Sequence, residues 1–156
     1  MPGWERMLRL IITFLFLVPL LTIAAEDAQQ LAAAAAAGRL YQVEALLERG
    51  ADVNARNSAG RPALVMAAFN GNRRTLAALL GAGADVNAVD EQGNSALMEA
   101  SARGHHSIVS SLLAAGADVN LKNKAGQSAL DRAKAGNNSM VISRLEAAGA
   151  TESGAD

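Results

Sequence analysis

The chain has 156 residues, a formal charge of −1 and no cysteine. The length fits one domain, the near-neutral charge offers no basic stripe of the kind that nucleic-acid binders carry, and the lack of cysteine excludes a disulfide framework and a lipoprotein acceptor. Hydrophobic residues make up 51% of the chain but aromatic residues only 3%, so we expect thin, closely packed helices rather than a large globular core.

The segment 1–25 is typical of a secretory signal peptide. Arg6 and Arg9 precede an apolar run over residues 10–25, and Glu26 follows directly. The run is shorter than the ~20 apolar residues that a membrane-spanning helix needs. We therefore expect cleavage after Ala24 or Ala25 and export of residues 26–156. An uncleaved N-terminal anchor is the alternative.

The next stretch predicts two helices. Asp27 is a plausible N-cap, because its carboxylate can accept hydrogen bonds from the amides of a first helical turn. Leu31 and six alanines follow, and alanine is the strongest helix former. Gly38 is expected to end this helix in a left-handed conformation. A second helix, over about residues 39–49, places Val43, Leu46 and Leu47 at helical spacing.

One motif then recurs at a constant interval. Gly-Ala-Asp-Val-Asn stands at 50–54, 83–87 and 116–120, and fades at 149–151. A fixed period of roughly 20 to 50 residues indicates a stacked array in which neighbouring units build a shared core. The positions expected in that core are Leu64, Ala67, Ala68, Leu76, Leu79 and Leu80, and their counterparts Leu97, Ala100, Ser101, Val109, Leu112 and Leu113.

The last copy indicates where the array ends. Each earlier copy has a leucine pair, but the fourth has Leu145 followed by Glu146. An unpaired carboxylate is costly in a buried interface, so we expect the outer face of this unit to meet water. The sequence thus predicts four units, at about 24–56, 57–89, 90–122 and 123–155, with the outer two acting as caps.

The repeating unit resembles the ankyrin repeat. In the third copy the family pattern is carried by Asp90, Gly93, Ser95-Ala96-Leu97-Met98, Ala100-Ser101, Gly104-His105, Ile108-Val109, Leu112-Leu113 and residues 116–120. The resemblance covers roughly residues 27–150. It implies an all-α solenoid of about four helix-turn-helix repeats joined by β-hairpin-like turns, here preceded by a signal-peptide helix.

The chain departs from the family pattern at several positions. Pro62 replaces a capping threonine that Ser95 and Ser128 keep in kind, and the family's histidine is absent. Its place is taken by Val65, Met98 and Asp131. We therefore expect the usual inter-turn hydrogen bonds to be missing. Asn137 replaces a turn glycine and should adopt the left-handed region.

Catalytic chemistry has little support in this sequence. His105 and His106 are adjacent and point to different faces of a helix, and the aspartates of the repeated motif lie a full repeat apart. No Gly-x-Ser-x-Gly elbow or phosphate-binding glycine loop occurs. We expect no enzyme activity, no metal and no cofactor, and a structural role for His105.

The resemblance implies protein binding through a concave face made by the turn tips and the exposed side of each first helix. Carried over to this chain, the contact positions are Arg56, Ser58, Arg61, Met66, Phe69, Asn70, Val89, Glu91, Gln92, Asn94, Glu99, Arg103, Lys122, Lys124, Gln127 and Arg132. Phe69 attracts attention as a lone aromatic at a position that varies in the family. Met66 and Phe69 form an apolar centre with arginines on both sides, which is typical of interface anchors.

These expectations combine into one hypothesis with two alternatives. The leading one is an exported, monomeric, non-catalytic module that binds a folded protein in a bacterial periplasm, either to stabilise an enzyme or to neutralise a toxin. The first alternative is a scaffold anchored in the inner membrane and facing the periplasm. The second is a secreted effector that binds host proteins.

Overall fold

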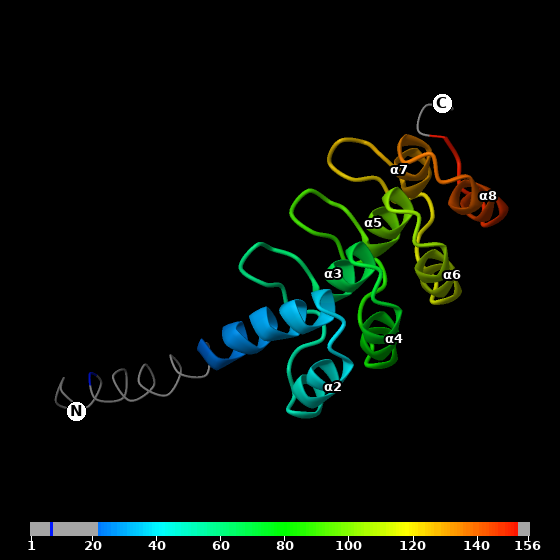
Figure 1. Ribbon diagram of the computed structural model, residues 1–156. Helices are drawn as coiled ribbons and strands as arrows, with labels where there is room; N and C mark the ends of the chain where they lie inside the picture. Colours follow the sequence, from blue (N-terminus) through cyan, green and yellow to red (C-terminus); the bar gives the residue numbers. More distant parts are fainter. Residues whose placement is uncertain (1–6, 8–21, 153–156) are drawn as a thin grey trace.

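The computed structural model describes residue 7 and residues 22–152 (Figure 1). Most of the expected signal peptide therefore lies outside the described residues. Ala24 and Ala25, the two expected cleavage positions, are exposed and helical, within the described helical residues 22–36. Within residue 7 and residues 22–152, no helix is long and apolar enough to cross a membrane.

The chain folds into two rows of helices, as Figure 1 shows. One row consists of the helix at 22–36 and the seven-residue helices α3 (Ala63–Phe69), α5 (Ala96–Ala102) and α7 (Ala129–Ala135). The other consists of the nine-residue helices α2 (Leu40–Glu48), α4 (Arg73–Gly81), α6 (His106–Ala114) and α8 (Ser139–Ala147). The expected all-helical repeat architecture is confirmed.

Three inter-repeat loops, at 49–62, 82–95 and 115–128, project from the first row (Figure 1). The described residues form no strand. Two isolated antiparallel bridges, Arg56 to Pro62 and Val89 to Ser95, close the first two loops. The expected β-hairpin-like turns are thus reduced to single bridges in the first two loops, and the third loop, at 115–128, contains none.

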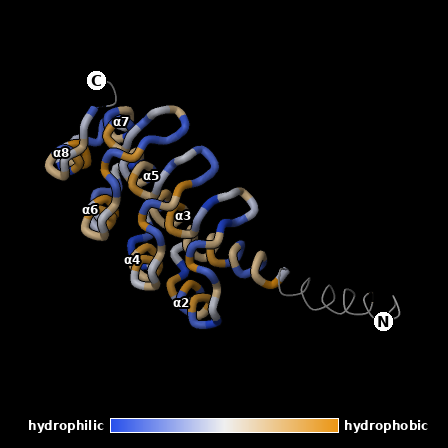
Figure 2. The backbone as a smooth tube through the Cα atoms, turned by 180° about the vertical axis from the view of Figure 1, so that it is seen from behind, coloured by the Kyte–Doolittle hydropathy of each residue, from blue (hydrophilic) through white to orange (hydrophobic). Residues whose placement is uncertain are grey.

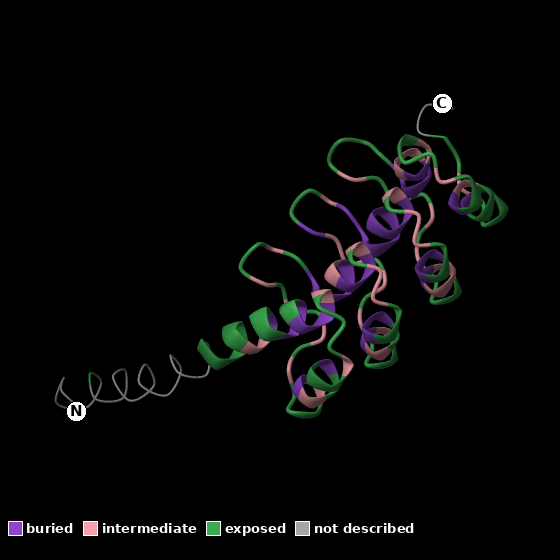
Figure 3. Ribbon diagram, viewed as in Figure 1, coloured by how far each residue is buried: buried purple, intermediate pink, exposed green. Residues whose placement is uncertain are grey.

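Alanine and leucine fill the space between the rows, which Figure 3 shows as a continuous buried band. Leu64, Leu79, Leu97 and Leu112 are almost fully buried, while the short Ala67 and Ala100 lie where helices of one row approach closely. The second leucines of the pairs were expected in this core. Leu47, Leu80 and Leu113 are only half-buried against its edge, because the next residue on a helix turns away from the face of its neighbour. Hydrophilic residues follow the loops instead (Figure 2).

Side-chain amides connect consecutive repeats at the ends of the first-row helices. Asn72 Nδ2 donates to the carbonyl oxygens of Ala35 and Ala36, at 3.0 and 2.6 Å. Asn138 Nδ2 donates to Ser101 and Ala102 in the same way, at 2.9 and 3.1 Å. The Ala35 and Ser101 carbonyl oxygens also accept from the Gly38 and Gly104 amides just past each helix, both at 3.3 Å. The asparagine side chains thus add hydrogen bonds from the next repeat to the end of each helix.

The repeated Gly-Ala-Asp-Val-Asn motif supplies a second ladder. Its asparagine oxygens accept hydrogen bonds from the backbone one repeat later: Asn54 from the Asp85 amide at 2.8 Å and Asn87 from the Asp118 amide at 2.8 Å. Its aspartates fold back on their own turn, as where Asp85 Oδ1 accepts from the Asn87 amide at 2.9 Å. Turn geometry and inter-repeat bonding account for the constant spacing of the motif along the chain.

Helices α5 and α7 begin at the N-caps that the sequence predicts. Ser95 accepts from the Met98 amide, whereas Pro62 makes no side-chain cap. Ser128 forms a full capping box with Asp131, whose Oδ2 accepts from the Ser128 amide at 2.7 Å. Asp131 stands where the ankyrin pattern has histidine, and its side chain caps the start of α7.

The expectation that Asp27 is an N-cap is wrong. Residues 22–36 are helical, so Asp27 lies inside the helix and has no free first-turn amides to accept from. Its carboxylate instead lies 3.6 Å from the Arg49 guanidinium. Residues 22–26 continue the helix upstream, since none of them breaks it.

The fourth unit places its leucine and its glutamate as expected. Leu145 is buried and Glu146 is exposed. Lys134, on the end of the first row, pairs with Glu152. The hydrogen bond from Lys134 to Glu152, together with nearby carboxylate charge, raises the pKa of Lys134 above its ordinary value despite some desolvation. Charged side chains thus cover the last unit where a fifth would stack.

Gly93 is a position where both conformation and space require glycine. Its φ is +80°, and an added Cβ would lie 3.1 Å from the Lys124 amide nitrogen in the next loop. Gly116 has a φ of +86° but would place a Cβ in open space. We expect Gly93→Ala to lower the unfolding free energy by about 2 kcal/mol or more and Gly116→Ala by about 1 kcal/mol. Urea denaturation followed by circular dichroism measures both, and equal losses would contradict the close contact.

Ser101 carries a buried hydroxyl whose Oγ has no hydrogen-bond partner within the described part of the chain. The aligned residue one repeat earlier is Ala68, which is equally buried. Ser101→Ala removes an unsatisfied polar group with little change in packing. We expect the melting temperature to stay the same or rise, with a gain of up to about 1 kcal/mol. A clear loss of stability would show that the hydroxyl makes a bond in solution.

Candidate functional site

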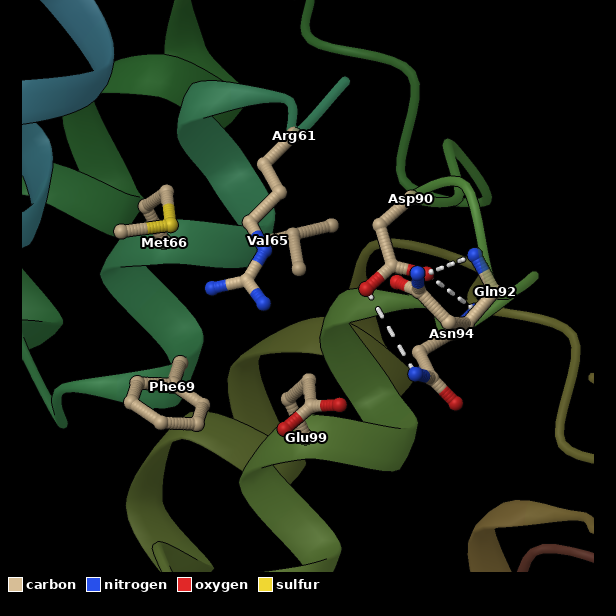
Figure 4. A pocket seen from close by; sticks show the side chains of 8 residues that line it. All are labelled: Arg61, Val65, Met66, Phe69, Asp90, Gln92, Asn94 and Glu99. Atoms are coloured by element: carbon tan, nitrogen blue, oxygen red, sulfur yellow. Dashed lines mark hydrogen bonds between the residues drawn. The ribbon is translucent and has the colours of Figure 1, made fainter. Parts of the chain in front are cut away.

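A pocket of about 220 Å³ opens between α3, α5 and the loop at 82–95. It lies on the concave face, defined here as the three inter-repeat loops and the adjacent exposed sides of α3, α5 and α7. Figure 4 shows its eight lining side chains, which are Arg61, Val65, Met66, Phe69, Asp90, Gln92, Asn94 and Glu99. The pocket therefore joins two neighbouring repeats.

The apolar wall belongs to α3. Val65, Met66 and Phe69 lie within one turn of this helix, with Phe69 three and four positions after the other two, so they share one side of it. Val65 is buried, and Met66 and Phe69 are half-buried. Helix geometry alone thus presents an apolar strip to whatever enters the pocket.

The opposite wall is built by Asp90 at the start of a turn. Its Oδ1 accepts from the backbone amides of Gln92 and Asn94, both at 2.9 Å. Asn94 Nδ2 lies 3.5 Å from Asp90 Oδ2, and Asn94 Oδ1 accepts from Asn123 Nδ2 at 2.8 Å. Asn57 and Asn123 hold the other two loops with the same pair of amide bonds. Asp90 is therefore engaged in holding its loop.

The second carboxylate of the pocket is paired as well. Glu99 on α5 lies 3.2 Å from the Arg132 guanidinium on α7, and its side chain is only 9% exposed. A buried carboxylate needs such a partner, because desolvation would otherwise be costly. Arg132 thus neutralises Glu99 from the following repeat.

Arg61 is in a different situation. It precedes Pro62 at the end of the first loop, and its guanidinium reaches toward the pocket between the α3 strip and Glu99 (Figure 4). Among the described residues its guanidinium makes no hydrogen bond or ion pair within ordinary distances. An exposed cation without a partner lies beside an apolar strip.

Phe69 is more tightly held than its sequence position suggests. The Arg103 guanidinium carbon lies 3.6 Å from the centre of the Phe69 ring, in cation–π contact. His105 Nε2 lies 3.3 Å from the Phe69 carbonyl oxygen, which gives that histidine the expected structural role. The expectation that Phe69 is a lone exposed aromatic needs correction, because the next repeat supplies a packing partner.

The structure places the expected contact residues in three groups. Exposed are Arg56, Ser58, Arg61, Asn70, Glu91, Gln92, Arg103, Lys122, Lys124 and Gln127; half-buried are Met66, Phe69, Val89 and Arg132; buried are Asn94 and Glu99. Six of them line the pocket, and the rest lie around it or along the loops.

Some of the exposed residues already have partners within the chain. Arg56 donates to the Val89 and Gly60 carbonyl oxygens, and Ser58 bonds to Gln29 through both its amide and its hydroxyl. Both side chains thus help to hold the first loop in place. They are less available to a partner protein than Arg61 or the loop lysines.

Sequence reasoning missed two lining residues, Val65 and Asp90. Both were identified as repeat positions with structural roles, and both do have such roles. The signal that could have found them is the period itself, since aligned positions of consecutive repeats stack. The start of the third unit, at Asp90, therefore comes to lie beside the first helix of the second unit, which carries Val65.

A family model of ankyrin repeats, in three copies, matches residues 30–123 and 64–145. The match covers most of the described part of the chain. No curated protein matches the chain significantly.

Proposed function

Because the chain belongs to the ankyrin-repeat family, we propose that it is a non-catalytic module that binds a folded protein through its concave face. Ankyrin repeats generally mediate protein–protein interaction. The observation that supports this face is the pocket in which Arg61, whose guanidinium has no partner among the described residues, lies beside Met66 and Phe69. Arginine and aromatic side chains over an apolar centre are the usual anchors of interfaces.

Site-specific photo-crosslinking in the native host tests the face. A crosslinking amino acid at Gln92, which lines the pocket and is exposed, should trap one partner as a discrete band. The matched control is Arg74, exposed on α4 in the other row of helices. Trapping from position 74 but not from position 92 would place the binding surface on the row formed by α2, α4, α6 and α8.

Export to a bacterial periplasm is the second part of the proposal. It is supported by Arg6 and Arg9, the apolar run that follows and the alanines before Glu26. In that compartment the partner would be an exported enzyme that is stabilised or a toxin that is neutralised. The mass of the purified protein should then correspond to a start at Ala25 or Glu26.

A membrane-anchored scaffold is the second candidate. One observation favours it: the first helix passes through Ala24 and Ala25 without a break, so no turn marks a boundary there. A mass that includes Met1, together with recovery in the membrane fraction, would select this form. The concave-face proposal is the same for both.

A further inference from the structure

We infer that the pocket selects an acidic, partly apolar segment of its protein partner, with a Glu or Asp carboxylate on Arg61 and a neighbouring apolar side chain against Met66 and Phe69. This inference rests on the proposed function and specifies the chemistry of the partner. The inference is based on a contrast among the charged residues of the pocket. Asp90 and Glu99 already have partners, whereas Arg61 has none among the described residues.

The two carboxylates of the pocket are engaged within the protein. Asp90 accepts from two backbone amides and lies beside Asn94, and Glu99 is paired with Arg132 at 3.2 Å. An entering lysine or arginine would have to displace one of these partners. A cationic segment therefore gains little from the pocket.

Arg61 offers the opposite chemistry. Its guanidinium has no ion pair or hydrogen bond with the residues that the structure describes, and it lies at the pocket with the apolar strip beside it (Figure 4). A guanidinium presents a planar fork of donors that matches a carboxylate. The apolar strip partly excludes water from that contact, which strengthens it.

Cations outnumber anions at the expected contact positions, though not over the loops as a whole. The contact positions together with Asp90 hold six cations and three anions, whereas the three loops carry five charges of each sign, since they also contain Arg49, Asp52, Asp85 and Asp118. Lys122 and Lys124, both exposed, are the contact cations of the third loop. Complementary charge steers a partner toward such a face and sets its register.

The test is selection of short random peptides, displayed on phage, against the protein in the form that its host produces. We expect enriched peptides to combine Asp or Glu with large apolar residues. An enriched peptide, labelled and measured by fluorescence anisotropy, should bind Arg61→Gln at least about tenfold more weakly than wild type. Arg74→Gln on α4 should leave its affinity unchanged, and added salt should weaken it.

The possible results separate the inference from the function it rests on. Neutral or basic peptides that depend on Phe69 would support concave-face binding and overturn the acidic class. If the affinity of the peptides is the same for wild type, Arg61→Gln and Phe69→Ala, or if no peptide is enriched, binding by the concave face is contradicted. The inference is then contradicted as well. An Arg61→Glu variant that enriches lysine-containing peptides would support the assigned role of Arg61 directly.

Discussion

Leu79→Ala is expected to lower the free energy of unfolding by about 2 to 5 kcal/mol. Leu79 is fully buried in α4, between the rows of helices. Truncation removes three carbon atoms from water-free packing and leaves a cavity, because helices fixed on both sides by neighbouring repeats collapse only partly. With few aromatic residues in the chain, this leucine packing supplies much of the stability of the second repeat.

The neighbouring Leu80→Ala is the matched control. The two leucines are adjacent, have the same chemistry and lie on the same helix, but Leu80 is only half-buried. Its truncation should cost about 1 kcal/mol, in proportion to the apolar area that it hides from water. Urea titration followed by far-ultraviolet circular dichroism measures both losses. Equal losses would mean that both leucines lie in the core, as the sequence first suggests.

Helical spacing, the repeat period and the resemblance to ankyrin repeats together predicted most of this fold. The spacing of Val43, Leu46 and Leu47 placed a helix at about 39–49, where α2 covers Leu40–Glu48. The resemblance implied the caps Ser95 and Ser128. Asn137 has the left-handed conformation expected of it, with a φ of +54°. These features are local, so the residue types and their spacing suffice to predict them.

The first helix shows where local reasoning fails. Asp27 fits the rule for an N-cap, but the rule applies only where a helix begins, and residues 22–26 have no feature that prevents continuation. Similarly, both leucines of each pair fit a helical pattern. Only the position of the neighbouring helices decides that Leu79 is buried and Leu80 half-buried.

The sequence predicted most residues of the candidate site but not which side chains contact one another. Most of the pocket residues were named from the family pattern, yet their partners lie about one period away. Glu99 pairs with Arg132 in the following repeat, and Phe69 is covered by Arg103, also from the repeat after its own. Stacking brings aligned positions together, so the period contains this information, but side-chain direction decides which neighbours meet.

The double variant Phe69→Ala/Arg103→Ala is expected to reduce the free energy of binding to the partner by about 2 kcal/mol or more in total. The change removes an aromatic anchor at the pocket together with the cation stacked on it. Because the two side chains touch, their single effects should not add, and each single variant should already lose much of the affinity. Isothermal titration calorimetry with the crosslinked partner, once identified, measures all three.

Stability must be followed in the same variants, because the Arg103 contact also holds Phe69. A cation–π contact at an exposed site is worth about 0.5 to 1 kcal/mol, and the half-buried Phe69 ring contributes about 1 kcal/mol more through its buried apolar area. The melting temperature should therefore fall, but by less than in Leu79→Ala. Tyr41→Ala is the matched control for affinity: Tyr41 is an aromatic residue on α2, 82% exposed, and lies outside the concave face. Unchanged affinity in the double variant, combined with a loss in Tyr41→Ala, would contradict binding at the pocket. It would place the binding site on the row of helices that contains α2.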